Sequence, residues 1–258
     1  MANYDRDAHA KKNPAVIARM EAEGWTSARY TQRVMNKEAK EARKNAPYTL
    51  QLEDVVIRQA DIKHGLEFIP TLSVNAIITD PLYDRRSLNL FSHLGQVASR
   101  VLVDSGVLLC MCPPTYLPEI MNRLGEYLRF WWQFIVIYPM QSSNLHFKRV
   151  SPNYKCVLLF TKQGHQYTGD LVSDVIYAPK PNKTRIHPMQ QDEKVFDHLI
   201  ESFTDPSHVV LDPFCGSGTT AICAVKARRL VVASDIDPEA VTMTRKRVYE
   251  ALDWELTL

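Results

Sequence analysis

Hydrophobic residues after residue 47 gather in short β-branched runs that alternate with amphipathic stretches. The runs have the length of buried strands and the stretches have helical periodicity, an alternation typical of an α/β domain built on a parallel sheet. We predict strands at Asn75–Thr79, Gly106–Met111, Phe134–Tyr138, Lys155–Thr161, His208–Leu211 and Leu230–Ser234. We predict helices at Leu88–Val103, Leu117–Tyr127, Glu193–Ser202, Thr219–Lys226 and Pro238–Leu252.

Two helices are predicted before this domain. Asn13 followed by Pro14 is a helix start, since Asn caps and Pro suits the first helical position, and Gly24 ends that segment. A second helix is predicted from Thr26 to about Arg43, closed by Asn45-Ala46-Pro47. The chain therefore divides into a helical extension, residues 1–46, and a main domain, residues 47–258.

The net charge of +2 says little about partners, but its distribution is uneven. Ten Lys and Arg stand against six Asp and Glu in the first 46 residues, so the extension is basic and the remainder is slightly acidic. Arg29, Arg33, Lys37 and Lys40 fall near one face of the second helix. The extension could lie on nucleic acid, or it could cover a sheet edge or mediate dimerisation, and both interpretations stay open.

The five cysteines are odd in number and sit mostly in apolar runs, which indicates reduced, structural thiols. Cys110 and Cys112 are one residue apart and lack the spacing of zinc ligands, so no metal is predicted. The first residues contain no apolar secretion signal, and no stretch approaches the length of a membrane span. These features lead us to expect a cytoplasmic protein.

A glycine-rich turn follows the strand predicted at His208–Leu211, in the run Asp212–Thr220. Small residues let the backbone approach a ligand, and the helix start behind them offers unpaired amides. The run matches neither a phosphate-binding P-loop nor GxGxxG. Asp235 ends the next strand, where an acid can accept hydrogen bonds from ribose hydroxyls. The pair predicts a nucleotide-like cofactor, while Asp237 is interpreted as a helix N-cap.

Asp80, Pro81 and Tyr83 follow the strand predicted at Asn75–Thr79, where parallel sheets present their ligands. This segment resembles the catalytic motif of DNA amino-methyltransferases, whose target, the exocyclic amine of a base, is a poor nucleophile because its lone pair is delocalised into the ring. The Asp80 carboxylate and the Pro81 carbonyl could accept its N–H bonds and aim the nitrogen at a methyl donor. Tyr83 could stack on a base taken out of the helix. The alternative is an ordinary Asp-Pro turn with Tyr83 packed locally.

The cofactor run resembles the S-adenosylmethionine-binding motif of DNA amino-methyltransferases, and His187-Pro188-Met189-Gln190 resembles their HPTQ segment. Gln191-Asp192 stands where that family commonly has Lys-Pro. The resemblance implies that the glycine turn holds the methionine moiety and that Asp235 holds the ribose. The cofactor residues it implies are Asp61, Asp212, Phe214, Gly216, Ser217, Gly218, Thr219 and Asp235.

Asp80-Pro81-Leu82-Tyr83 resembles the family's DPPY catalytic motif, with Leu82 in place of the second proline. It precedes the cofactor motif, an order that resembles the permuted β class of these enzymes. That class implies a Rossmann-like, circularly permuted sheet of seven strands, mostly parallel, with one reversed edge strand. An opening Asp rather than Ser favours adenine N6 over cytosine N4.

In that class the target-recognition segment lies between the motifs, here a short surface loop region around 164–186. We expect double-stranded DNA with a flipped base as the partner, and a homodimer is possible. The basic candidates for phosphate contact are Lys148, Arg149, Lys180, Lys183 and Arg185, with solvated loop charge as the alternative for each.

Three other functions stay open: cytosine N4 methylation of DNA, adenine methylation of RNA, and a degenerate fold that binds nucleic acid without catalysis. The compact length suggests a solitary or restriction-modification methylase of a bacterium or phage-infected cell.

Overall fold

The computed structural model describes residues 13–45, 50–82, 84–138, 149–150, 152–165, 167, 169, 171–179 and 192–253. The chain divides into two compact units, Met1–Tyr48 and Thr49–Leu258. Within the described residues, no helix is long and apolar enough to cross a membrane.

The first unit is a pair of helices, α2 (Pro14–Glu23) and α3 (Ala28–Asn45). The Asn13 side chain accepts a hydrogen bond from Ala15 N and caps α2, and Gly24 ends it in a left-handed conformation, as the sequence predicts. Val16 and Ala28 are fully buried where the helices meet. Trp25 and Tyr30 pack edge to face at 5.2 Å between ring centroids.

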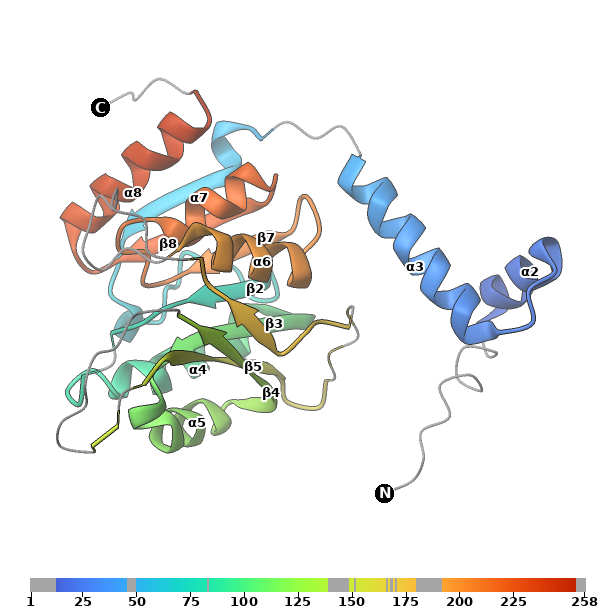
Figure 1. Ribbon diagram of the computed structural model, residues 1–258. Coiled ribbons are helices and arrows are strands. Elements are labelled where there is room, and N and C mark those ends of the chain that lie inside the picture. The colour runs from blue at the N-terminus through green and yellow to red at the C-terminus, as the bar shows by residue number, and fades with distance from the viewer. Residues whose placement is uncertain are drawn as a thin grey trace. The chain divides into compact units, whose positions relative to one another are not determined.

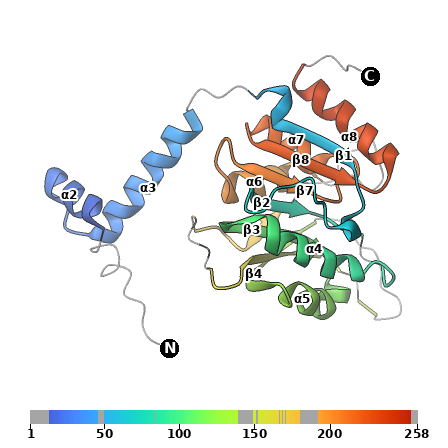
Figure 2. The same ribbon diagram turned by 180° about the vertical axis from the view of Figure 1, so that it is seen from behind.

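The second unit is a single sheet in the order β1-β8-β7-β2-β3-β5-β4-β6 (Figures 1 and 2). All neighbouring strands are parallel except β5, which runs antiparallel to both β3 and β4. The strands are β1 (Val55–Gln59), β2 (Val74–Thr79), β3 (Leu102–Cys112), β4 (Leu128–Ile137), β5 (Tyr154–Lys162), β6 (Val175–Tyr177), β7 (Val209–Asp212) and β8 (Leu230–Asp235).

Helices cover both faces of this sheet, with α4 and α5 on one face and α6 and α7 on the other (Figures 1 and 2). Helix α8 packs beside α7 and against β1 and β8. Apolar side chains of α4 and α5, including Phe91, Leu94 and Ile120, close the main core against β2, β3 and β5, which contribute Leu108 and Phe160. The helices are α4 (Asn89–Val101), α5 (Leu117–Gly125), α6 (Glu193–Phe203), α7 (Thr219–Lys226) and α8 (Pro238–Ala251).

All six predicted strands and all five predicted helices of this unit are confirmed, with ends shifted by a few residues. Two strands were not predicted, and both lie at edges of the sheet. Strand β1 pairs with β8, and β6 pairs with β4 inside the region predicted to be a surface loop. The prediction of seven strands is therefore wrong, because Val175–Tyr177 adds an eighth.

The predicted position of the reversed strand is also wrong. The class that the chain resembles implies a reversed strand at an edge, whereas β5 lies inside the sheet between β3 and β4. Its long ladders to both neighbours, from Val107↔Thr161 on one side to Ile137↔Tyr154 on the other, bury the backbone groups that an edge would expose. Reversal also brings the start of β5, rather than its end, to the edge where the parallel strands end.

Candidate active site

Acidic residues follow the carboxyl ends of four parallel strands. Asp212 and Asp235 end β7 and β8, while Asp61 and Asp80 come just after β1 and β2. These strands are neighbours in the sheet, so their ends meet at one edge. The predicted catalytic and cofactor residues are therefore brought together, although the two motifs are far apart in the sequence.

The glycine turn between β7 and α7 depends on two glycines with positive φ. Gly216 has φ +49°, and a Cβ there would meet only Phe214 O, at an ordinary contact distance of 4.0 Å, whereas Gly218 has φ +83° and packs against Thr244 of α8. A Cβ at Gly218 would lie 2.9 Å from Thr244 Oγ1, so only glycine fits there. The Thr244 hydroxyl in turn donates to the Gly216 carbonyl at 3.0 Å.

Asp235 closes the turn from the neighbouring strand. Its Oδ2 accepts a hydrogen bond from Gly216 N at 2.9 Å, and its Oδ1 accepts one from Asp237 N at 3.1 Å. Asp237 itself accepts from Glu239 N and caps α8, as the sequence predicts. The two acids are therefore distinct: Asp235 touches the glycine turn and Asp237 caps a helix.

Asp212 is buried at the junction of the two motifs. Its Oδ1 accepts hydrogen bonds from the Thr79 hydroxyl at 2.6 Å and from Phe214 N at 3.1 Å. Burial raises the pKa of this carboxyl to about 6, against the opposing effect of hydrogen bonds from Thr79, Thr220 and Phe214. Thr79 directly precedes Asp80, so this bond ties the start of the catalytic motif to the start of the cofactor motif.

Asp80 is largely buried, and its carboxylate faces a lysine. Lys155 Nζ, from the start of β5, lies 3.5 Å from Asp80 Oδ2. Pro81 is buried and Leu82 is 63% exposed. The chain then turns at Asp84, which accepts from the backbone N–H groups of Arg86 and Ser87. These bonds lower the pKa of the Asp84 carboxyl.

Two buried thiols on β3 lie close to these acids. Burial and the charges of Asp80 and Asp212 raise the pKa of Cys110 well above its ordinary value. The pKa of Cys112 is also raised, by its hydrogen bond with Cys156 and by burial. These two thiols remain protonated and are not nucleophiles at neutral pH. Among the described residues, no group of three His, Cys, Asp or Glu could hold a metal ion.

Side chains behind the glycine turn brace it. The Arg247 guanidinium donates to the Ser217 carbonyl and to Glu193 Oε1, the latter at 3.2 Å. Glu193 also pairs with Lys226 at 3.0 Å. The turn is thus fastened to α8 and, through Glu193, to the first turn of α6 and the last turn of α7.

The donor set of this turn fits a nucleoside cofactor. The Asp235 carboxylate supplies acceptors for hydroxyl groups, and Gly216 leaves space beside the backbone. The Thr219 hydroxyl at the start of α7 is buried and has no hydrogen-bond partner among the described residues. Asp61 accepts from Lys63 N and caps a short 3-10 helix, Ile62–His64.

Several predicted site residues lie outside the described residues. Of the candidates for DNA contact, only Arg149 is described, and it is exposed with φ +53°. The other four candidates, Lys148, Lys180, Lys183 and Arg185, lie outside the described residues. Tyr83 and the His187–Gln191 segment also lie outside them.

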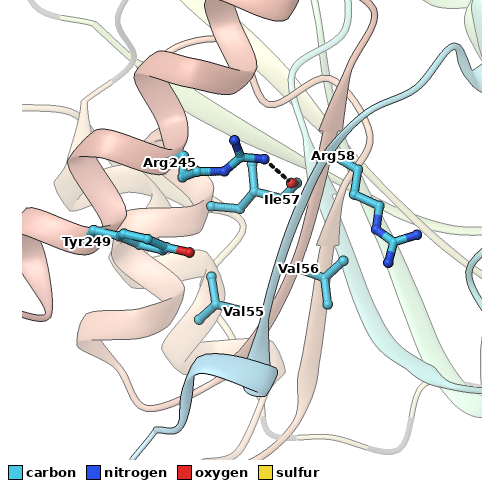
Figure 3. A pocket seen from close by; sticks show the side chains of 6 residues that line it. All are labelled: Val55, Val56, Ile57, Arg58, Arg245 and Tyr249. Atoms are coloured by element: carbon cyan, nitrogen blue, oxygen red, sulfur yellow. Dashed lines mark hydrogen bonds between the residues drawn. The ribbon is translucent and has the colours of Figure 1, made fainter. Parts of the chain in front are cut away.

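A separate pocket of about 350 Å³ lies between β1 and α8 (Figure 3). Arg245 crosses it and donates to the Ile57 carbonyl at 2.9 Å, with Tyr249 alongside, while Arg58 points away on the other side of the strand. None of the predicted cofactor or catalytic residues lines it.

Three residues of this site were missed by sequence reasoning. Thr79 could have been noticed because a threonine ends a buried strand directly before the catalytic acid. Lys155 and Thr244 carry no local signal, since each reaches the site from an element distant in the sequence.

The sheet has the Rossmann-like fold of S-adenosylmethionine-dependent methyltransferases. The structure of the M1.HpyAVI–SAM complex matches with TM-score 0.60 and 20% identity, covering 75% of this chain and 98% of that chain. The PvuII DNA methyltransferase, described as cytosine-N4-specific, matches with TM-score 0.63 and 17% identity, covering 78% and 95%.

The sequence comparison is more specific. The family model of the N6/N4 DNA methylases matches residues 46–246, so this chain belongs to that family of DNA methyltransferases. The type II methyltransferase M.HpaI of Haemophilus parainfluenzae is 24% identical in an alignment over 216 residues that covers 68% of this chain and 68% of that protein.

Proposed function

We propose that this protein transfers a methyl group from S-adenosylmethionine to the exocyclic amino group of a base in double-stranded DNA, with adenine N6 as the preferred target. The hydrogen bond from Thr79 to Asp212 is the observation that carries the proposal. It holds Asp80 beside the glycine turn. A target amine at Asp80 and a methyl donor in the turn would therefore meet at the carboxyl ends of the neighbouring strands β2 and β7.

The cofactor would lie across the ends of β7 and β8. Asp235 would accept hydrogen bonds from the ribose hydroxyls, and the turn from Phe214 to Thr219 would enclose the methionine portion. Asp61, after β1, would contribute from the next strand along the sheet. When bound, S-adenosylmethionine supplies an electrophilic methyl carbon on a positively charged sulfur.

The residues after β2 would position the base. The Asp80 carboxylate and the Pro81 carbonyl would accept hydrogen bonds from the N–H groups of the amine and direct its nitrogen at the methyl carbon. Tyr83 would stack on the base after it leaves the duplex, because a stacked base hides the reacting nitrogen. Leu82, exposed beside them, would contact the base or the strand that it leaves.

DNA would be held by the basic residues Lys148, Arg149, Lys180, Lys183 and Arg185, which neutralise phosphates. We also infer that the order of the two motifs places the chain in the permuted β class, and that the helical extension, residues 1–46, is separate from the catalytic domain. A homodimer is compatible with this assignment.

Cytosine N4 methylation is the second candidate, because the PvuII enzyme, which shares this fold, is described as cytosine-N4-specific. The preference for adenine rests on the Asp that opens the catalytic motif.

The test is incubation with S-adenosylmethionine and unmethylated double-stranded DNA, or RNA in a parallel reaction, followed by mass spectrometry of the nucleosides. We expect N6-methyl-2′-deoxyadenosine from DNA. N4-methylcytosine would move the assignment to the second candidate, and methylation of RNA alone would reject DNA as substrate. Binding of nucleic acid without any methyl transfer would support the degenerate fold.

A further inference from the structure

Lys155 is the second residue of β5, the only reversed strand among the eight described. Its ammonium lies 3.5 Å from Asp80 Oδ2, with 25% of the lysine side chain and 13% of the aspartate side chain exposed. A pair so little exposed is screened less by water than a surface ion pair. It therefore acts on Asp80 more strongly than a surface lysine would.

The sheet topology explains how the lysine arrives there. In the ladders, Thr79 pairs with Cys110 on β3, and Cys112 pairs with Cys156 on β5. Lys155 is thus at the level just beyond the end of β3, and its ammonium lies 3.5 Å from Asp80 Oδ2. An ordinary parallel strand in the same place would bring its last residue to this edge, whereas the reversed strand brings its first.

Cys110, Cys112 and Asp212, which also lie near Asp80, carry no positive charge. Cys110 and Cys112, from β3, are held neutral by their raised pKa values. Asp212, from β7, is an acid with a pKa raised to about 6, so it adds negative charge above that pH. The Lys155 ammonium offsets this negative charge beside Asp80.

We propose that Lys155 is a positioning residue for methyl transfer, which holds the Asp80 carboxylate ionised and in a fixed orientation to receive the target amine. The inference rests on the proposed function. One carboxylate oxygen stays with the ammonium while the carboxylate accepts the N–H of the base, so the lysine acts through Asp80 and transfers no proton itself.

The chain offers a matched control on the same strand. Lys162 lies at the other end of β5 from Lys155, and it pairs with Asp104 at 3.3 Å instead of Asp80. Lys155→Met and Lys162→Met remove the same charge and keep similar apolar stems. Lys155→Arg retains the charge, and a positioning role predicts that it recovers part of the lost rate.

The kinetic test measures the pH dependence of kcat and of the KM for S-adenosylmethionine with DNA as substrate. We expect Lys155→Met to lower kcat about 10- to 100-fold, as misplacement of a reacting group does. The acidic limb of its kcat profile should move to higher pH, because loss of a neighbouring cation disfavours the anion. The KM of Lys155→Met for S-adenosylmethionine should have the same pH dependence as that of wild type. Asp212, whose titration would affect cofactor binding, is present in all variants. Lys162→Met should behave as wild type.

A second readout does not depend on activity. The carboxyl ¹³C signal of Asp80, assigned by its loss in Asp80→Asn, is followed against pH in the free protein. We expect its midpoint to rise in Lys155→Met and to stay unchanged in Lys162→Met. An unchanged midpoint in Lys155→Met, or a kcat profile equal to wild type, overturns the inference while wild-type methylation still supports the proposed function. If the midpoint shifts in Lys155→Met but wild type methylates nothing, the proposed function and the positioning role of Lys155 are both overturned.

Discussion

The Thr79 hydroxyl donates a 2.6 Å hydrogen bond to the buried carboxylate of Asp212, joining the end of β2 to the end of β7. The two strands pair in parallel at Ala76↔Val210 and Ile77↔Leu211, so the bond lies just beyond their shared ladder. It fixes the spacing between the segment that would hold the base and the segment that would hold the cofactor.

Thr79→Val removes the hydroxyl and keeps the side-chain shape. Because hydrogen bonds to charged groups contribute about 1.5–3 kcal/mol, we expect the free energy of unfolding to fall by that amount at pH 8. The loss should be smaller at pH 5, where Asp212 is largely protonated. Urea unfolding at both values checks this, with Thr79→Ser as the control that keeps the donor. Equal losses for Val and Ser would show that the hydroxyl contributes nothing.

Asp212→Asn should change the pH dependence of stability. The folded-state pKa of about 6 lies above the ordinary value of 3.8, so the native state binds this proton more tightly than the unfolded state. The stabilisation is complete below pH 3.8 and is lost as pH rises through 6, a difference of about 3 kcal/mol. The Asn variant lacks this titration. Relative to wild type it should therefore gain stability between pH 4 and pH 8, measured by thermal unfolding. Parallel profiles would contradict the assignment.

Asp235 and Asp237 form a matched pair two residues apart. Asp235→Ala should weaken S-adenosylmethionine binding at least about tenfold, or about 1.4 kcal/mol, because it removes the acceptor for the ribose. Asp237→Ala should leave the affinity unchanged and cost about 1 kcal/mol of stability, as loss of an N-cap does. Calorimetric titration and thermal unfolding of both variants separate the two roles. Equal affinity losses would remove the distinction between them.

Gly218→Ala should destabilise the protein more than Gly164→Ala. Both glycines have nearly the same positive φ, +83° and +82°, so an alanine costs about 1 kcal/mol at either position. At Gly164 the new Cβ meets nothing within 4 Å, whereas at Gly218 it meets Thr244 at 2.9 Å. Overpacking adds about 1–3 kcal/mol at Gly218 alone. Urea midpoints that are equal for the two variants would show that the turn can move away from α8.

The predictable part of the fold was the part with a strong local pattern. Each of the six predicted strands contains an apolar run, and the glycine turn and Asp235 occupy fixed places around one strand–helix–strand unit. Strand β1 was missed because its second half, Arg58 and Gln59, is exposed at an edge and interrupts the apolar run. Strand β6 has three residues, too few for periodicity to identify.

Pairing between distant segments was not predictable in the same way. The direction and place of β5 depend on ladders to β3 and β4, which a single apolar run such as Cys156–Phe160 does not encode. The contact between Lys155 and Asp80 follows from that placement, as does the packing of Thr244 against Gly218. Side chains that complete a site from another element are visible only after the sheet is assembled.

The central claim is that Asp80 positions the amine while the ends of β7 and β8 hold the cofactor. Its most direct test is a single-turnover measurement of labelled methyl transfer to double-stranded DNA at saturating S-adenosylmethionine, comparing wild type with Asp80→Ala. The account predicts transfer by wild type, and a rate lower by about 100-fold or more in the variant, since positioning of the reacting group is lost. A variant that methylates DNA at the wild-type rate would contradict it.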